Sequence, residues 1–258
     1  MNNRTIQISG AVLSAVLVHP AWADAAVPGG ASNHIELSTE SSRLSNGTPD
    51  WRETSMRLTS KLNRQTVRSV VLSQTNRFGL DDHEISGSLS APASDQLTAT
   101  VSGSFSPTHR VLARHSLEGS LQYEFAPAWL IHGGLGQRRY DATRVDHASL
   151  MLEHYFSSFS VSVAWKPVQA LGARSESVEL RVSYYYGDAN SAGLIISSGR
   201  EATSTRPGTV VLADVRATAL LGRHWLNRQW AVNYALSRTQ QGNFYTRNSV
   251  RLGAEYAF

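Results

Sequence analysis

The chain ends with Val250-Arg-Leu-Gly-Ala-Glu-Tyr-Ala-Phe258, and this stretch decides the fold. Apolar residues occupy every second position, and the positions between them are charged or small. Because successive side chains of a β-strand point to opposite faces, one face of this segment is apolar and ends in two aromatic rings, while the other is polar. A strand with one lipid-compatible face and one polar face is typical of a barrel that spans a membrane.

Length and composition limit the class of protein. With 258 residues, the chain suits one large domain or two small ones. It contains no cysteine, which excludes thiol chemistry, disulfides and cysteine metal sites. The mean hydropathy of −0.25 excludes a helical membrane protein. It is compatible with a barrel, because half of each barrel strand is polar.

The N-terminus has the order of residues found in secretory signal peptides. Arg4 supplies a positive charge, residues 6–18 are mostly apolar, and Ala21-Trp22-Ala23 has small residues where a signal peptidase cuts. We predict a signal peptide over 1–23, a flexible leader over 24–33 and a barrel over 34–258. Cleavage leaves 23 of the 24 basic residues and all 20 acidic ones, a net charge of about +3. That excess is too small to indicate a nucleic-acid partner.

From residue 34 onward, segments of alternating polarity follow one another to the end of the chain. They predict an all-β, antiparallel up-and-down transmembrane barrel of about 14 strands. In the segments near 66–77 and 191–198 it is ambiguous which residues face outward, and merging these two strands into others would give 12 strands instead. The predicted strands are 34–43, 51–62, 66–77, 82–90, 96–105, 114–125, 129–139, 146–156, 159–167, 176–186, 191–199, 209–222, 229–239 and 245–258.

The links between these segments alternate between short and longer. The longer ones are 45–50, 106–113, 141–145, 167–175 and 200–208. Bacterial barrels have short periplasmic turns and longer outer loops, so the pattern predicts that both termini face the periplasm of a Gram-negative bacterium. Aromatic residues near the strand ends predict two girdles at the membrane interfaces. A soluble β-sandwich also alternates, but the signal peptide and these aromatics favour the barrel.

Several local motifs, in order along the chain, resemble the YaiO-type outer-membrane β-barrel proteins. The motifs are Leu44-Ser45-Asn46-Gly47 with Pro49-Asp50-Trp51, Ser106-Pro107-Thr108-His109-Arg110, Arg114-His115-Ser116-Leu117, Gln122-Tyr123-Glu124-Phe125, Ser183-Tyr184-Tyr185-Tyr186-Gly187, Gly222-Arg223-His224-Trp225 and Tyr245-Thr246-Arg247. The resemblance implies an outer-membrane barrel and no established reaction. The terminal strand likewise resembles the closing strand of bacterial outer-membrane proteins. Tyr256 and Phe258 are therefore predicted to act as a signal for the barrel-assembly machinery.

A nucleophile beside a base would indicate an enzyme, because some outer-membrane barrels modify lipids. In phospholipase-type barrels a His stands two positions before the Ser of a Ser-Asn-Gly segment, but Arg43 stands there in this chain. His115 and Ser116 are adjacent, so a strand would point them to opposite faces. No spacing of histidines and carboxylates indicates a metal, and no cofactor is predicted. We therefore predict no catalytic residue, with a surface enzyme that modifies lipid or polysaccharide as the alternative.

Strand parity predicts which charged side chains face the lumen. Both signs occur, so acids and bases could bridge and close the lumen, or water could fill it. The many small inward residues and the width of a 14-strand barrel favour a hydrated lumen. The predicted lumen charges are Glu84, Glu118, Glu153, Glu179, Arg181, Asp214, Arg216, Arg251 and Glu255. The same parity also places further polar side chains in the barrel interior, namely Glu53, Arg57, Lys61, Gln122, Glu124 and Asn233.

Arginines are frequent in the predicted outer loops. Guanidinium groups suit two-point contacts with phosphate or carboxylate, which makes lipopolysaccharide or an acidic glycan a plausible partner. Ordinary solvated charges, some paired with Asp141, Asp146 or Glu201, are the simpler interpretation. The residues concerned are Arg110, Arg114, Arg138, Arg139, Arg144, Arg174, Arg200 and Arg206. The leading hypothesis for the whole chain is a structural or porin-like barrel that passes small solutes or a surface glycan.

Overall fold

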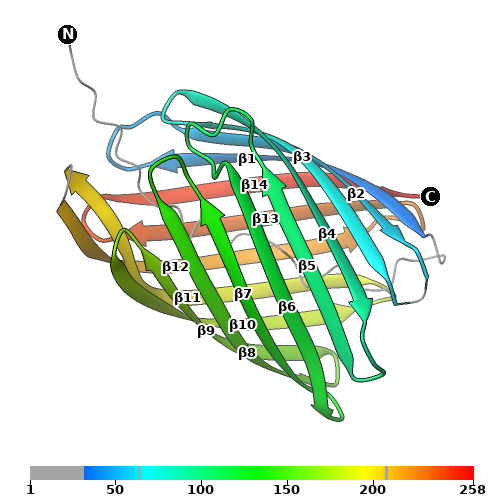
Figure 1. Cartoon of the computed structure of the whole chain (residues 1–258). Helices are drawn as coiled ribbons and strands as arrows, with labels where there is room; N and C mark the ends of the chain where they lie inside the picture. The colour runs from blue at the N-terminus through cyan, green and yellow to red at the C-terminus, as the bar shows by residue number, and fades with distance from the viewer. Residues whose placement is uncertain (1–31, 64, 207–208) are drawn as a thin grey trace.

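The computed structural model describes residues 32–63, 65–206 and 209–258. The predicted signal peptide and nearly all of the predicted leader lie outside these residues. The described part forms a single closed antiparallel barrel, in which β1 pairs with β14 (Figure 1). The strands are β1 Asn33–Leu44, β2 Trp51–Lys61, β3 Val67–Arg77, β4 Leu80–Pro92, β5 Leu97–Phe105, β6 His115–Ala126, β7 Trp129–Arg139, β8 Arg144–Phe156, β9 Phe159–Ala170, β10 Ala173–Tyr186, β11 Asn190–Arg206, β12 Thr209–Trp225, β13 Trp230–Gln241 and β14 Tyr245–Ala257.

The fourteen strands confirm the predicted barrel and its larger strand count. Both ambiguous segments are separate strands, β3 and β11, which exclude the count of twelve. No helix among the described residues has the length and apolar character needed to cross a membrane.

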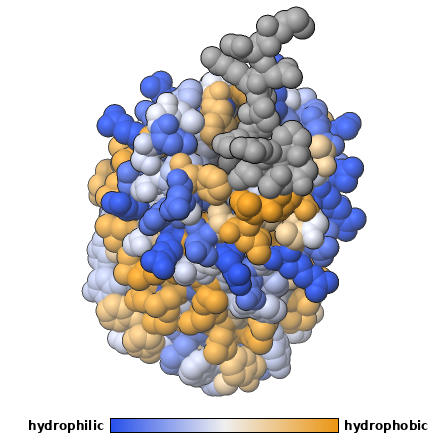
Figure 2. All heavy atoms as spheres, turned by 90° about the vertical axis from the view of Figure 1, so that its left-hand side faces the viewer, coloured by the Kyte–Doolittle hydropathy of each residue, from blue (hydrophilic) through white to orange (hydrophobic). Residues whose placement is uncertain are grey.

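The barrel has two ends that differ in chemistry. β1 begins beside the end of β14, where Asn33 N donates to Phe258 O at 3.2 Å and Phe258 N donates to Asn33 O at 2.9 Å. We call this the terminal end and the opposite one the far end. Figure 2 views the far end, where hydrophilic side chains project around much of the margin.

The outer surface of the barrel is apolar over a band that starts at the terminal end. Outward positions carry large side chains such as Leu37, Val101, Leu135 and Leu252, each more than half exposed. In water such exposure would be unfavourable, whereas lipid tails solvate these side chains. The band therefore marks the surface that faces the hydrocarbon of a bilayer.

Aromatic rings form a belt at the terminal end of this band. An unbroken series of ring contacts, each with centroids no more than 6.3 Å apart, runs from Phe125 through Trp129, Phe156 and Tyr184 to Tyr234. Trp230, Tyr256 and Phe258 add a second group of contacts there. The two predicted girdles rested on nine aromatics, of which Trp165 of β9 lies away from this end. The other eight lie at this end, so the described residues support one girdle: Tyr123, Phe125, Trp129, Tyr184, Tyr186, Trp230, Tyr256 and Phe258.

Two of the predicted long links are in fact strand. β9 continues to Ala170 and β10 starts at Ala173, so that only Leu171 and Gly172 connect them. Both residues have positive φ, 54° and 75°, as a two-residue hairpin turn requires. β11 and β12 likewise extend through most of the predicted 200–208 link. The far end is therefore built partly from extended hairpins rather than from loops.

The phase of β12 is opposite to the prediction. Ala213, Val215 and Ala219 are 1% to 6% exposed and face the lumen, whereas Asp214 and Arg216 are exposed on the outer surface. The predicted lumen positions of Asp214 and Arg216 are therefore wrong. The inward Ala213, Val215 and Ala219 are small enough to line the interior, whereas Asp214 and Arg216 lie on the outside at and beyond the far edge of the apolar band.

Candidate functional site

The lumen is the candidate site, and one of its walls is lined by hydroxyl groups. Pairs of side chains on neighbouring strands of β3–β6 bond to each other across the sheet. Their oxygens are 2.8 Å apart in Ser69–Ser88 and in Ser104–Ser116, and 3.0 Å apart in Ser90–Thr100. These pairs give the wall a polar surface of small side chains, which leaves room inside a barrel of this strand number.

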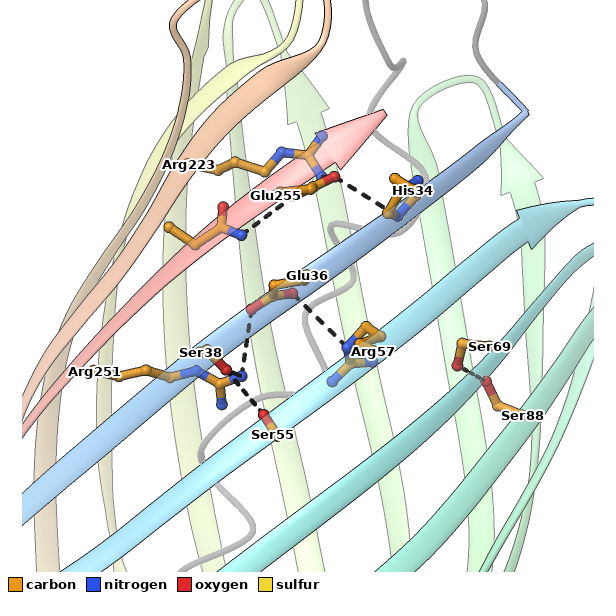
Figure 3. Close-up of polar contacts among 11 residues, drawn as sticks. His34, Glu36, Ser38, Ser55, Arg57, Ser69, Ser88, Arg223, Arg251 and Glu255 are labelled. Atoms are coloured by element: carbon orange, nitrogen blue, oxygen red, sulfur yellow. Dashed lines mark hydrogen bonds and ion pairs between the residues drawn. The ribbon is translucent and has the colours of Figure 1, made fainter. Parts of the chain in front are cut away.

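A cluster of charges lies across the seam between β1 and β14 (Figure 3). Glu36 and Glu255 stand directly opposite each other in the register, an unfavourable placement for two acids. Arg251 Nη2 lies 3.4 Å and Arg57 Nε 3.9 Å from the Glu36 carboxylate. Around Glu255, Arg223 Nη1 lies at 4.0 Å and His34 Nε2 at 3.7 Å. Cations from neighbouring strands thus compensate both acids and tie the seam together.

A second cluster surrounds Trp51 nearer the far end. Trp51 points inward and is 5% exposed. The guanidinium groups of Arg77 and Arg247 each lie 5.0 Å from the centre of its ring. Arg77 also lies 3.8 Å from Glu53. Each guanidinium group is within the range of a cation–π contact, so the ring attracts both cations and offsets part of their mutual repulsion.

The wall made by β6–β10 carries further ion pairs. His132 Nε2 lies 3.1 Å from Glu153, and His147 Nε2 lies 3.3 Å from Glu118. On β10, Glu179 is contacted by Lys166 at 2.7 Å and by Arg181 at 3.4 Å. Glu153 and Glu179 are 6% and 4% exposed, so these contacts compensate the burial of both carboxylates.

An apolar patch interrupts the polar lining on β11–β13. Ile195, Ala219, Leu221 and Ala235 are each at most 8% exposed and pack together on the lumen side. Met151 on β8 joins them in lining the same cavity. The lumen therefore has an apolar wall as well as charged and hydroxyl-lined walls.

Two cavities of more than 200 Å³ lie in the lumen between these walls. A far cavity of about 210 Å³ is lined mainly by β2–β8. A terminal cavity of about 370 Å³ is lined by the seam cluster, the hydroxyl wall and the apolar patch. The two cavities share lining residues, which shows that they adjoin. The shared residues are Arg57, Ser69, Ser88, Ser102 and Glu118.

The loop between β5 and β6 folds inward at the far end, and Asp82 of β4 fixes it. Asp82 is fully buried and its carboxylate accepts three backbone N–H groups of the loop, from Arg110 at 2.9 Å, Val111 at 2.7 Å and Leu112 at 2.8 Å. Residues 111–113 line the far cavity. The loop, which contains the motif Ser106-Pro107-Thr108-His109-Arg110, thus narrows the far mouth of the lumen.

The structure places most predicted lumen charges on the inner face. Asp214 and Arg216 are the exceptions described above. The inward residues are Glu84, Glu118, Glu153, Glu179, Arg181, Arg251 and Glu255. Several ionisable lumen residues were not predicted, because they lie near strand ends or beside residues of similar polarity. These are His34, Glu36, Glu40, Arg77, Arg223 and Arg247.

The predicted outer-loop arginines are dispersed. Arg110 and Arg114 lie in the β5–β6 loop, and Arg138 faces the far cavity. Arg139, Arg144, Arg174 and Arg200 are exposed on strands rather than in loops. Arg144 forms an ion pair with Asp146 at 2.9 Å. The side chain of Arg206 lies outside the described part of the chain.

The histidines do not form a catalytic arrangement with the serines singled out in the sequence. Ser116 bonds to Ser104 on the lumen side, and its neighbour His115 is exposed on the opposite face. His109 uses Nε2 for Asp141 at 3.0 Å and Nδ1 for the carbonyl of Ser106 at 3.1 Å. Among the described residues, no group of three or more His, Asp or Glu is placed to hold a metal ion.

The closed strand order, the apolar outer band and the polar lumen define a membrane β-barrel of the outer-membrane, porin-like type. The sequence model of the family described as the YaiO membrane β-barrel domain matches residues 32–204. The chain therefore belongs to the YaiO membrane β-barrel family, which confirms the resemblance seen in the sequence.

Similar solved structures are barrels of several kinds. The chain is similar to the CymD monoaromatic hydrocarbon channel, with a TM-score of 0.61 at 10% identity over 88% of this chain and 89% of that one. An anion-selective porin from Comamonas acidovorans gives a TM-score of 0.51 at 10% identity, covering 88% and 99%. The translocator domain of the autotransporter NalP from Neisseria meningitidis gives 0.51 at 12% identity, covering 89% of each chain. At such identities the likeness concerns the fold alone. No curated protein matches the sequence.

Proposed function

We propose that this protein is a passive, non-enzymatic channel for small solutes, with both chain ends on the periplasmic side of the outer membrane. The observation that carries the proposal is the adjoining pair of lumen cavities, which provides space from the far end towards the terminal end. The ion pairs between described residues of the lumen support it, because each joins side chains on the same strand or on strands at most two apart. These pairs strengthen the walls without bridging opposite sides of the lumen.

The lining of the terminal cavity favours particular solutes. Its charged residues include four arginines, at 57, 181, 223 and 251, and three glutamates, at 36, 118 and 255. This excess of positive charge favours anions weakly. The apolar patch on β11–β13 favours solutes with an apolar part over hydrophilic sugar chains. Small organic anions are therefore the proposed cargo, in preference to a surface glycan.

Conductance in planar bilayers tests the proposal. The purified protein is expected to give stepwise currents and a reversal potential of weak anion selectivity in a KCl gradient. Arg57 and Glu118 line both cavities. Arg57→Gln is expected to shift selectivity towards cations and Glu118→Gln towards anions. Arg216→Gln is the matched control, because Arg216 faces outward and should leave the reversal potential unchanged. Silent bilayers with folded, heat-modifiable protein would refute the proposal.

A further inference from the structure

Five exposed arginines form a row on the outer surface of the barrel. Each has the outward parity of its strand and lies where the apolar band ends towards the far end. We call these residues the arginine row: Arg200 of β11, Arg216 of β12, Arg238 of β13, Arg43 of β1 and Arg52 of β2.

Strand register makes the members of the row neighbours. Arg238 and Arg43 stand on either side of Asn248 of β14, each directly opposite that residue. Arg216 stands opposite Ser198, two residues from Arg200. Residues in a diagonal position on adjacent strands, as Arg200 and Arg216 are, lie about 7–8 Å apart, within reach of long side chains. Adjacent guanidinium groups of the row can therefore contact the same anion.

The row lies at a fixed depth relative to the aromatic belt. Arg238 is eight residues along β13 from Trp230, and Arg216 is eight residues along β12 from His224. With a rise of about 3.4 Å per residue and a tilt of about 40°, eight residues span roughly 20 Å of bilayer. This is close to the height of about 25 Å of the apolar band of such barrels. The belt and the row thus mark the two interfaces of one bilayer on these strands.

The row carries positive charge that the described protein does not neutralise. Among the described residues, none of the five guanidinium groups forms an ion pair with a carboxylate. Asp214, opposite Arg200, is the acidic residue within the row. The nearby Glu176 of β10 accepts a hydrogen bond from Trp165 Nε1 at 2.9 Å. Neighbouring cations repel one another, so an external anion would stabilise this surface.

We propose that the arginine row binds the phosphate groups of phosphorylated glycolipid in the leaflet that surrounds the far end. The row lies at headgroup depth, its spacing allows two arginines to share a phosphate, and guanidinium forms two parallel hydrogen bonds with such a group. The assignment to the outer leaflet rests on the proposed orientation of the chain. The binding itself does not depend on whether the lumen conducts.

Native mass spectrometry of the full mature barrel in detergent tests the proposal. The probes are lipid A with two phosphates and the same lipid after dephosphorylation. The wild type is expected to retain the phosphorylated lipid and to release the dephosphorylated one. The triple variant Arg43→Gln, Arg216→Gln and Arg238→Gln is expected to bind roughly 100-fold more weakly, from a factor of about five per arginine. Lysine at the same three positions should restore part of the binding, because it keeps the charge without the paired hydrogen bonds.

The matched control removes the same charge from the far end outside the row. Arg110→Gln, Arg139→Gln and Arg144→Gln change three exposed arginines near β5–β8. This variant is expected to bind the phosphorylated lipid as the wild type does. Equal retention of both lipids by the wild type, or equal loss in the two triple variants, would overturn the proposal. Heat modifiability on gels shows that each variant is folded, and the bilayer currents test the channel separately.

Discussion

Removing the carboxylate of Asp82 should release the β5–β6 loop from the far mouth of the lumen. This carboxylate accepts three backbone N–H groups of the loop, at 2.7–2.9 Å. A hydrogen bond to a charged acceptor contributes about 1.5 kcal/mol at the low end of its range, so the three together contribute about 4.5 kcal/mol. Asp82→Ala should therefore lower the hydrogen-exchange protection of the amides of Arg110, Val111 and Leu112 by about a factor of 10³.

The same change should also widen the channel, because residues 111–113 line the far cavity. Single-channel conductance is expected to rise in Asp82→Ala and to rise less in Asp82→Asn, whose amide oxygen can still accept. Asp81→Ala is the control, since Asp81 is exposed and accepts its bond from Asn76 at 2.8 Å instead. Unchanged amide protection in Asp82→Ala would refute the anchoring role. Lost protection with unchanged conductance would refute the role of the loop in narrowing the lumen.

Three further predictions concern assembly and stability. Gly199→Ala would bring a Cβ atom within 2.4–2.5 Å of Glu176 O and of the Cα and Cβ atoms of Ser177 on β10, so it should destabilise the barrel by about 1–3 kcal/mol in urea unfolding. In the control Gly119→Ala the new Cβ atom meets nothing within 4 Å, so the change should cost less than about 0.5 kcal/mol. Equal unfolding midpoints for the two variants would contradict this prediction. Trp51→Ala should cost about 3–5 kcal/mol and Trp51→Phe clearly less, because phenylalanine keeps an aromatic face for the two guanidinium groups to contact. The heat-modifiability midpoint measures the difference, and equal losses would disprove the role of the ring. Phe258→Ala should refold normally in detergent but reach lower levels in the outer membrane of cells, measured by membrane fractionation, because Phe258 is predicted to be an assembly signal. Poor refolding in detergent would instead assign Phe258 a structural role.

Much of the fold follows from the alternation of side chains, and its failures have a common cause. The sequence predicted fourteen antiparallel strands, and the structure has fourteen. Alternation is clear where large apolar residues face lipid, as in Leu117-Glu-Gly-Ser-Leu121. It is lost where a strand leaves the bilayer, because both faces then meet water or the lumen. The far ends of β9, β10, β11 and β12 lie in such regions, so these strands were predicted too short.

The candidate site was less predictable because its parts come from distant strands. Local alternation could not show that Glu36 lies beside Glu255, because 218 residues separate them in the sequence. They become neighbours only when β1 pairs with β14. The inward fold of the β5–β6 loop depends in the same way on Asp82, a single carboxylate on another strand. Register and closure, which no local pattern specifies, create both features.

The reversed phase of β12 connects the lumen and the outer surface. Because Val215, Ala219 and Leu221 point inward, β12 contributes to the apolar lumen wall that favours solutes with an apolar part. The same phase turns Arg216 outward, where register aligns it with the other members of the arginine row. A phase with Arg216 inside would have put an additional cation into the lumen and left a gap in the row. The channel proposal and the lipid-binding proposal therefore both depend on β12. The outward position of Arg216 distinguishes them, because replacing Arg216 should weaken lipid binding and leave ion selectivity unchanged.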